Sequence, residues 1–263
     1  MSSKIRYGKC KLCGELKQLT FEHVPPKSAF NNVSATIISG DEIIQSIADE
    51  ERKPWEFRKY SGKIQQRGKG GFYLCGVCNN NAGQWYATEY IKFVGAIHCA
   101  LKLVGEAEYG SLGIKMKNIR PLAVFKQVMM MFCDINEGLM GDDSLKTYLL
   151  DKKMTEFNKD KYSLYAYIHT GNIERMHGIC AVANNKGIYF ISEISGYPIG
   201  LALYIDKPKD FKPEGVEITL FSEFEYDDLV EMEVIIPKLE NNIFFPGDYR
   251  TKDEILNCMR GNV

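Results

Sequence analysis

Two pairs of closely spaced cysteines constrain this 263-residue chain more than any other feature of its sequence. Each pair, Cys10–Cys13 and Cys75–Cys78, has two residues between its cysteines. A tight turn with this spacing presents two thiolates to one metal ion, and four thiolates satisfy a tetrahedral zinc ion. Sharing one ion closes a loop of about 60 residues, which chain entropy otherwise opposes. We therefore predict one structural zinc site, formed by Cys10, Cys13, Cys75 and Cys78.

Two unrelated pairs, or redox-active pairs, are the alternative interpretation. Zinc is favoured because grouped cysteines in cytosolic proteins bind metal more often than they form disulfides. The first six residues lack the apolar stretch of a signal peptide, and the most apolar helical stretch, residues 91–104, is too short and too charged to cross a membrane. The sequence thus predicts a cytoplasmic protein with no membrane partner. The four single cysteines are expected to be small buried hydrophobic residues: Cys99, Cys133, Cys180 and Cys258.

The charge of the chain is unevenly distributed. A net charge of −1, with 45% hydrophobic and 25% charged residues, is typical of a globular protein and argues against a basic nucleic-acid binder. Residues 1–95, however, carry 14 Lys+Arg and 9 Asp+Glu, a charge of +5, which leaves −6 for the remainder. Both cysteine pairs lie in the basic part. We predict two domains, residues 1–105 and residues 106–263, and infer that the acidic part restrains non-specific DNA binding.

Hydrophobic periodicity predicts an α+β fold. A strand is expected at 19–24, a short helix capped near Ser39, and an exposed loop or hairpin at 61–71. An apolar stripe from Tyr90 to Val104 predicts a long helix that Gly105 ends, and a second helix is expected from Pro121 to Phe132. Period-two patterns predict a mainly antiparallel sheet, backed by these two helices, with strands at 164–168, 179–183, 188–191, 201–205, 216–220 and 232–236.

Three polar residues accompany the cysteine pairs. Glu22 and His23 lie between the pairs, and Asn79 directly follows the last cysteine. Taken singly, such a histidine is usually a hydrogen-bonded structural residue and such an asparagine a helix cap. Taken together, a carboxylate and an amide oxygen are hard ligands that suit Mg²⁺, and a neutral imidazole beside them can accept a proton from water.

The motifs Cys10-x-x-Cys13, Glu22-His23-Val24-Pro25-Pro26 and Cys75-x-x-Cys78-Asn79-Asn80 resemble those of the HNH, or ββα-metal, endonucleases. The subgroup with a four-cysteine zinc site is especially similar, and the resemblance covers roughly residues 8–95. It implies an N-terminal, zinc-stapled ββα-metal nuclease domain, followed by an α+β region with a sensor, regulatory or oligomerisation role. The chain departs from the family in having no histidine at the place on the helix after Cys78 where many of these enzymes have a metal ligand, since His98 is too far along. The family's middle asparagine has no firm counterpart, and Asn80 and Asn81 are candidates for supporting roles.

The resemblance also implies residue roles. Glu22 and Asn79 would hold a catalytic Mg²⁺ or Mn²⁺, His23 would be the general base, and DNA phosphodiester bonds would be hydrolysed to 5′-phosphate and 3′-hydroxyl ends. An antiphage or mobile-element nuclease is the implied setting, with a homodimer or an unidentified regulatory partner left open. Basic residues in and before the glycine-rich 61–71 segment are candidates for phosphate contacts: Lys27, Lys63, Arg67 and Lys69, together with Arg58 and Lys59.

Two other functions remain open from the sequence. The first is a non-catalytic zinc module that binds DNA or a partner protein, with Glu22 and His23 as a hydrogen-bonded pair. The second is an enzyme whose active site lies in the C-terminal region, where His169 or His177 would serve, although neither has a recognisable partner in the sequence.

Overall fold

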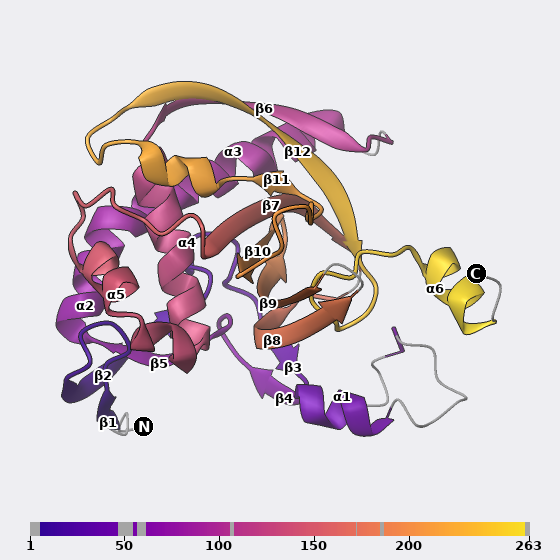
Figure 1. Ribbon diagram of the computed structural model, residues 1–263, viewed down its shortest axis with the longest axis horizontal. Coiled ribbons are helices and arrows are strands. Elements are labelled where there is room, and N and C mark those ends of the chain that lie inside the picture. Colours follow the sequence, from indigo (N-terminus) through magenta and orange to yellow (C-terminus); the bar gives the residue numbers. More distant parts are fainter. Residues whose placement is uncertain are drawn as a thin grey trace.

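The computed structural model describes residues 6–46, 55–56, 62–105, 108–171, 173–184 and 187–260. Its chain is mixed α+β with a mainly antiparallel sheet, as predicted. The small N-terminal sheet and helices α2 and α5 lie on one side of helix α4, and the large sheet lies on the other (Figure 1). Among the described residues, no helix is both long enough and apolar enough to cross a membrane.

The N-terminal sheet has three antiparallel strands in the order β1-β2-β5. They are β1 (Arg6–Lys9), β2 (Leu16–His23) and β5 (Gly70–Cys75). Helix α2 (Gly76–Ala82) begins directly after β5 and continues through a π-helical segment, η2 (Gly83–Ala87), into α3 (Thr88–Val104). The predicted long helix ends at Gly105, which adopts a positive φ of 62°. Strand β2 contains most of the strand predicted at 19–24, whereas β1 was not predicted.

The segment between β2 and β5 forms a second, smaller sheet. Strand β3 (Ala35–Ile37) pairs with β4 (Lys63–Gln65), and α1 (Gly40–Ser46) follows β3. As expected, Ser39 caps this helix, because its hydroxyl accepts a hydrogen bond from the Glu42 amide at 3.2 Å. The described part of the 61–71 segment is a strand, a turn and the start of β5, which pairs with β2 and not with β4. This turn therefore links two different sheets. Arg58 and Lys59 lie outside the described residues.

The large sheet has the strand order β6-β12-β7-β10-β9-β8, with β11 (Val216–Glu217) paired to β7. All of its pairs are antiparallel except β12 with β7, which is parallel. The strand predicted at 216–220 is shorter than expected, since a 3-10 helix, η4 (Thr219–Glu223), replaces its second half. The other strands are β6 (Ser111–Ile119), β7 (Tyr162–Gly171), β8 (Met176–Asn184), β9 (Gly187–Gly196), β10 (Ile199–Ile205) and β12 (Val230–Asn241).

Helix α4 (Pro121–Ile135) lies between the N-terminal elements and the large sheet (Figure 1). Fourteen of its residues, from Pro121 to Asp134, are buried. It contacts α3, η2, η4, β8 and β9, and also the 3-10 helix η3 (Glu137–Gly141) and α5 (Asp143–Leu150) that follow it. The last helix, α6 (Lys252–Met259), lies at the edge of the molecule near the C-terminus (Figure 1).

One hydrophobic core extends across the domain boundary predicted at residue 105. The same cluster of buried side chains includes Leu12 and Val24 from the N-terminal part and Phe132 and Ile236 from the C-terminal part. Burial of shared apolar surface is the main favourable term in folding. The two parts therefore stabilise each other, and the division at residue 105 stays a prediction.

Candidate metal centre

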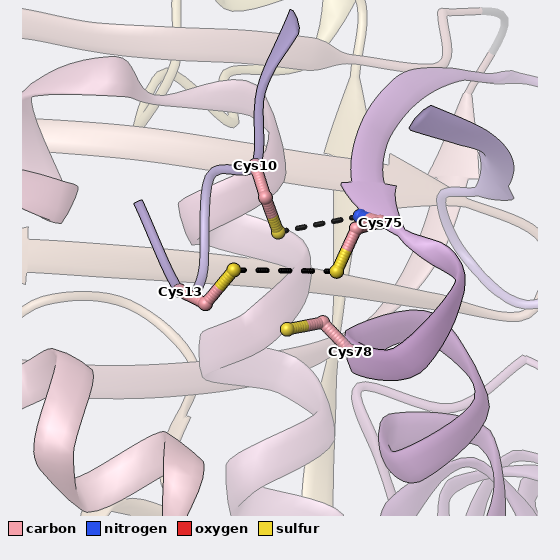
Figure 2. Close-up of side chains that lie close together, drawn as sticks. All are labelled: Cys10, Cys13, Cys75 and Cys78. Atoms are coloured by element: carbon pink, nitrogen blue, oxygen red, sulfur yellow. Dashed lines mark hydrogen bonds between the residues drawn. The ribbon is translucent and has the colours of Figure 1, made fainter. Parts of the chain in front are cut away.

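The four predicted zinc ligands lie together at the junction of β1, β2, β5 and α2. Figure 2 shows their side chains converging from the β1–β2 turn on one side and from the β5–α2 junction on the other. Their Sγ atoms all lie within 4.8 Å of one another, and the Sγ atoms of Cys13 and Cys75 are 4.0 Å apart. A tetrahedral zinc ion with Zn–S bonds of about 2.3 Å places its sulfurs about 3.8 Å apart. The cluster can thus bind a metal such as zinc.

Backbone hydrogen bonds shape the first half of this cluster. In the β1–β2 turn, the Cys10 amide donates to the Glu15 carbonyl and the Gly14 amide donates to the Cys10 carbonyl, both at 2.9 Å. Gly14 has a positive φ of 76°, which glycine adopts without steric cost. Across the cluster, the Cys75 amide donates to Cys10 Sγ at 3.2 Å. This bond between a backbone amide and a sulfur joins the two halves of the cluster.

The surroundings of the thiols favour thiolate formation at Cys10. A hydrogen bond with Cys78 is the largest cause that lowers the pKa of Cys10, to about 4, and the same interaction raises the pKa of Cys78. Burial raises the pKa of Cys13. The thiolate is the form of cysteine that binds metal, so zinc binding releases the remaining protons.

Glu22 and Asn79 are brought together beside this cluster. Glu22 is on β2, opposite Gly71 of β5, and Asn79 is on α2. The Asn79 side chain hydrogen bonds to the Glu22 carboxyl and also donates to the Thr20 hydroxyl at 2.9 Å. Burial raises the pKa of Glu22 to about 7, and the bond from Asn79 partly opposes this shift. The Asn79 amide nitrogen is the donor in these bonds, and the Glu22 carboxyl lies beside it.

His23 has different neighbours from Glu22. Successive side chains of a strand point to opposite faces of the sheet, and the His23 ring packs edge-on against Phe21, with ring centroids 4.9 Å apart. Its Nε2 is 3.1 Å from the Arg67 carbonyl oxygen. Because a carbonyl only accepts, Nε2 is the donor and Nδ1 is left as the basic nitrogen. The described contacts of His23 are therefore with Phe21 and Arg67, and not with Glu22 or Asn79.

Asn31 holds the segment that contacts His23, and the sequence did not single it out. This buried amide donates to the carbonyls of Pro25 at 2.6 Å and Lys69 at 2.8 Å, and it accepts from the Lys69 amide at 2.7 Å. Asn80 and Asn81, the residues proposed for supporting roles, lie on α2. The signal for Asn31 was weak, since an asparagine after Pro25-Pro26 is equally typical of a loop.

The basic residues predicted to contact phosphate fall into two groups. Lys27, Lys63 and Arg67 are exposed. Lys69 is mostly covered, with 11% of its side chain exposed, and its ammonium donates to Glu174 at 2.6 Å. Glu174, which lies between β7 and β8, therefore neutralises Lys69. The sequence near Lys69 does not reveal this partner.

The two C-terminal histidines have no comparable cluster around them. Burial lowers the pKa of His169 to about 4, which keeps it neutral at physiological pH. The His177 ring bonds to the neighbouring Gly178 carbonyl at 2.8 Å. Across the ranges that the structure describes, the four cysteines are the one group of three or more histidine, cysteine or acidic side chains close enough to share a metal ion.

Comparison with protein-family models, curated proteins and solved structures found no match to this chain.

We predict that the purified protein holds one zinc ion per chain and that Cys10→Ser loses it. The loss lowers the free energy of unfolding by about 4 kcal/mol, the loop-closure entropy of a cross-link over about 60 residues. Elemental analysis and chemical denaturation measure the two effects. Cys99→Ser is the control, because Cys99 lies outside the cluster and, like Cys258, is exposed, whereas the sequence predicted both to be buried. Equal zinc content in both variants would contradict the four-cysteine site.

A second prediction concerns Gly70, which pairs with His23. A Cβ at Gly70 would lie 2.0 Å from the Glu22 carbonyl oxygen, so Gly70→Ala forces β2 and β5 apart. We expect a loss of at least about 2 kcal/mol in stability. The control is Gly95→Ala on α3, where a Cβ meets no atom within 4 Å and helix propensity predicts a gain of about 0.5–1 kcal/mol. Chemical denaturation of both variants checks this, and a Gly70→Ala protein as stable as the wild type would refute it.

A third prediction follows from the raised pKa of Glu22. Between about pH 4.5 and pH 7 the folded protein binds more protons at Glu22 than the unfolded chain does, so this carboxyl lowers stability as the pH rises. Without divalent cations other than zinc, Glu22→Gln should therefore gain stability relative to the wild type from pH 5 to pH 8, by up to about 3 kcal/mol. Denaturation curves at the two pH values measure this difference. A constant difference would show that Glu22 titrates normally.

Proposed function

We propose that this chain is a metal-dependent endonuclease of the HNH type that hydrolyses phosphodiester bonds of DNA. The observation that supports it most is the contact between Glu22 on β2 and Asn79 on α2, beside a four-cysteine cluster. The sequence motifs resemble this enzyme class at those same positions. The proximity of Glu22 and Asn79 supports the roles that the resemblance implies for these two residues.

The donor set beside the cysteines fits Mg²⁺ or Mn²⁺. Both ions prefer carboxylate, amide and water oxygens. Because burial raises the pKa of Glu22 to about 7, the carboxyl is partly ionised at neutral pH, and a cation can bind the ionised form and displace the remaining proton. The bound ion would stabilise negative charge on the phosphate and on the departing 3′ oxygen. In this proposal Glu22 and Asn79 hold it, and the zinc fixes the strand and helix that carry them.

In this proposal His23 acts as the general base. Its Nε2–H donates to the Arg67 carbonyl, which fixes the ring and leaves Nδ1 free to take a proton from water. The imidazolium that forms keeps its bond to that carbonyl, so the same contact stabilises the charged ring. Asn31 secures this arrangement, because it binds both amide and carbonyl of Lys69, two residues beyond Arg67.

The exposed lysines and arginine near this site are the proposed contacts to the DNA backbone. Lys27, Lys63 and Arg67 are free of the ion pair that occupies Lys69. Each neutralised phosphate releases condensed counterions, so binding through such residues weakens as salt rises. The acidic C-terminal part contributes Glu174 at the edge of this surface, which accords with a role in restraining non-specific binding.

We predict that the wild type nicks plasmid DNA with Mg²⁺ or Mn²⁺ and that His23→Ala is at least about 100-fold slower, the usual contribution of a general base. Glu22→Gln and Asn79→Ala should lose activity as well. His177→Ala is the matched control, since that histidine bonds to its neighbour's backbone and should be fully active. Initial nicking rates measure these effects. A wild type no faster than His23→Ala with either ion would overturn the catalytic assignment.

A zinc module that binds DNA or a protein without cleaving it is the second candidate. The described contacts of His23 favour it, because they are with Phe21 and Arg67 and not with Glu22 or Asn79. On that assignment wild type and His23→Ala bind DNA equally well, and neither cuts it. The nicking assay, run beside a binding titration, separates the two functions.

A further inference from the structure

Asp134 is a buried carboxyl group with an unsatisfied oxygen. It lies in the last turn of α4, its residue is 2% exposed, and its Oδ1 has no hydrogen-bond partner. The other buried acidic residues in the described chain are bonded, Glu89 to Arg120 and Glu193 to Arg175. The C-terminal end of a helix also disfavours negative charge. A carboxylate at this place therefore lacks the partner that its burial requires.

A chain of contacts leads from Asp134 to Gly71, the residue paired with Glu22. The Lys11 ammonium donates to the Asp134 carbonyl at 2.6 Å and lies over the Tyr73 ring, 4.7 Å from its centroid. The hydroxyl end of Tyr73 packs over Gly71, where a Cβ would be 2.6 Å from the phenolic oxygen. Gly71 is the residue paired with Glu22. Asp134 thus lies where α4, the cysteine turn and the Glu22 strand meet.

The charges at this meeting point are mostly negative. Burial is the main cause that raises the pKa of Asp134; the nearby Glu22 and Cys10 raise it further, and Lys11 opposes them. Among the groups that shift the pKa of Asp134, Lys11 therefore supplies the only positive charge that offsets the negative charges of Glu22 and Cys10. A divalent cation between the carboxyl groups would satisfy the unpartnered oxygen and remove their mutual repulsion.

We propose that Asp134 supplies a third oxygen donor to the divalent cation held by Glu22 and Asn79. This inference rests on the proposed function for the identity of the other two ligands. Two carboxylates and one amide form a donor set typical of Mg²⁺ or Mn²⁺, with water completing the octahedron. The assignment also gives the C-terminal part of the chain a direct role in the site, because α4 lies beyond the segment that resembles a nuclease.

Titration of the zinc-loaded protein with Mn²⁺, followed by calorimetry, tests this assignment. Asp134→Asn keeps the shape of the side chain and removes its charge, and we expect it to weaken Mn²⁺ binding by at least about tenfold. Asp143→Asn is the control and should bind as the wild type does, since its side chain is 91% exposed. Zinc content, measured on each variant, shows that the cysteine site and the fold are intact. If Asp134→Asn does not fold, Asp134→Ser is tested in its place.

Thermal melting supplies a second readout that does not depend on activity. Without Mn²⁺, Asp134→Asn should melt higher than the wild type because a buried carboxyl group has been neutralised. With saturating Mn²⁺, the wild type should gain stability and the variant should gain little. If Asp134 has only a structural role, Mn²⁺ should not change which of the two proteins melts at the higher temperature.

The outcomes separate this inference from the proposed function. Unchanged Mn²⁺ affinity in Asp134→Asn overturns the inference, even if His23→Ala abolishes nicking. A wild type that binds no Mn²⁺ overturns it as well. Binding of Mn²⁺ that needs Asp134, in a protein that does not cut DNA, supports the inference and rejects the nuclease.

Discussion

The convergence of four cysteine sulfurs is the constraint on which the candidate site depends. It joins the β1–β2 turn to the β5–α2 junction, two places more than 60 residues apart in the chain. Because α2 begins at this junction, the cluster also sets where Asn79 lies relative to Glu22. Lys11, inside the first cysteine pair, attaches the same turn to the end of α4. A metal ion bound here would therefore fix the positions of β2, α2 and α4 relative to one another.

The C-terminal part of the chain contacts the N-terminal part at two places near the candidate site. Helix α4 belongs to the core that both parts share, and its last turn carries Asp134 to the neighbourhood of Glu22. Glu174 reaches back to Lys69 in the same way. Both contacts bring acidic groups from the negatively charged part to the basic part. They give a structural meaning to a charge asymmetry that the net charge of −1 conceals.

Local patterns allowed much of the fold to be predicted, and long-range contacts account for the rest. The cysteine spacing predicted the cluster, and the stripe from Tyr90 to Val104 predicted α3 with its end at Gly105. Strand β6 was missed although Ile114 and Met116 alternate with Lys115 and Lys117, a period-two pattern that is typical of a strand. The parallel pairing of β12 with β7 has no local signature. Nor has the contact of Lys11 with Asp134, which joins residues 123 positions apart.

The central claim is that a zinc-bound cysteine cluster holds a second, oxygen-rich cation site at Glu22 and Asn79. Anomalous diffraction from crystals soaked in Mn²⁺, recorded at the zinc and manganese absorption edges, tests it directly. We predict a zinc peak among the four sulfurs and a separate manganese peak in contact with the side-chain oxygens of Glu22 and Asn79. Manganese absent from those oxygens, or no zinc among the sulfurs, would contradict it.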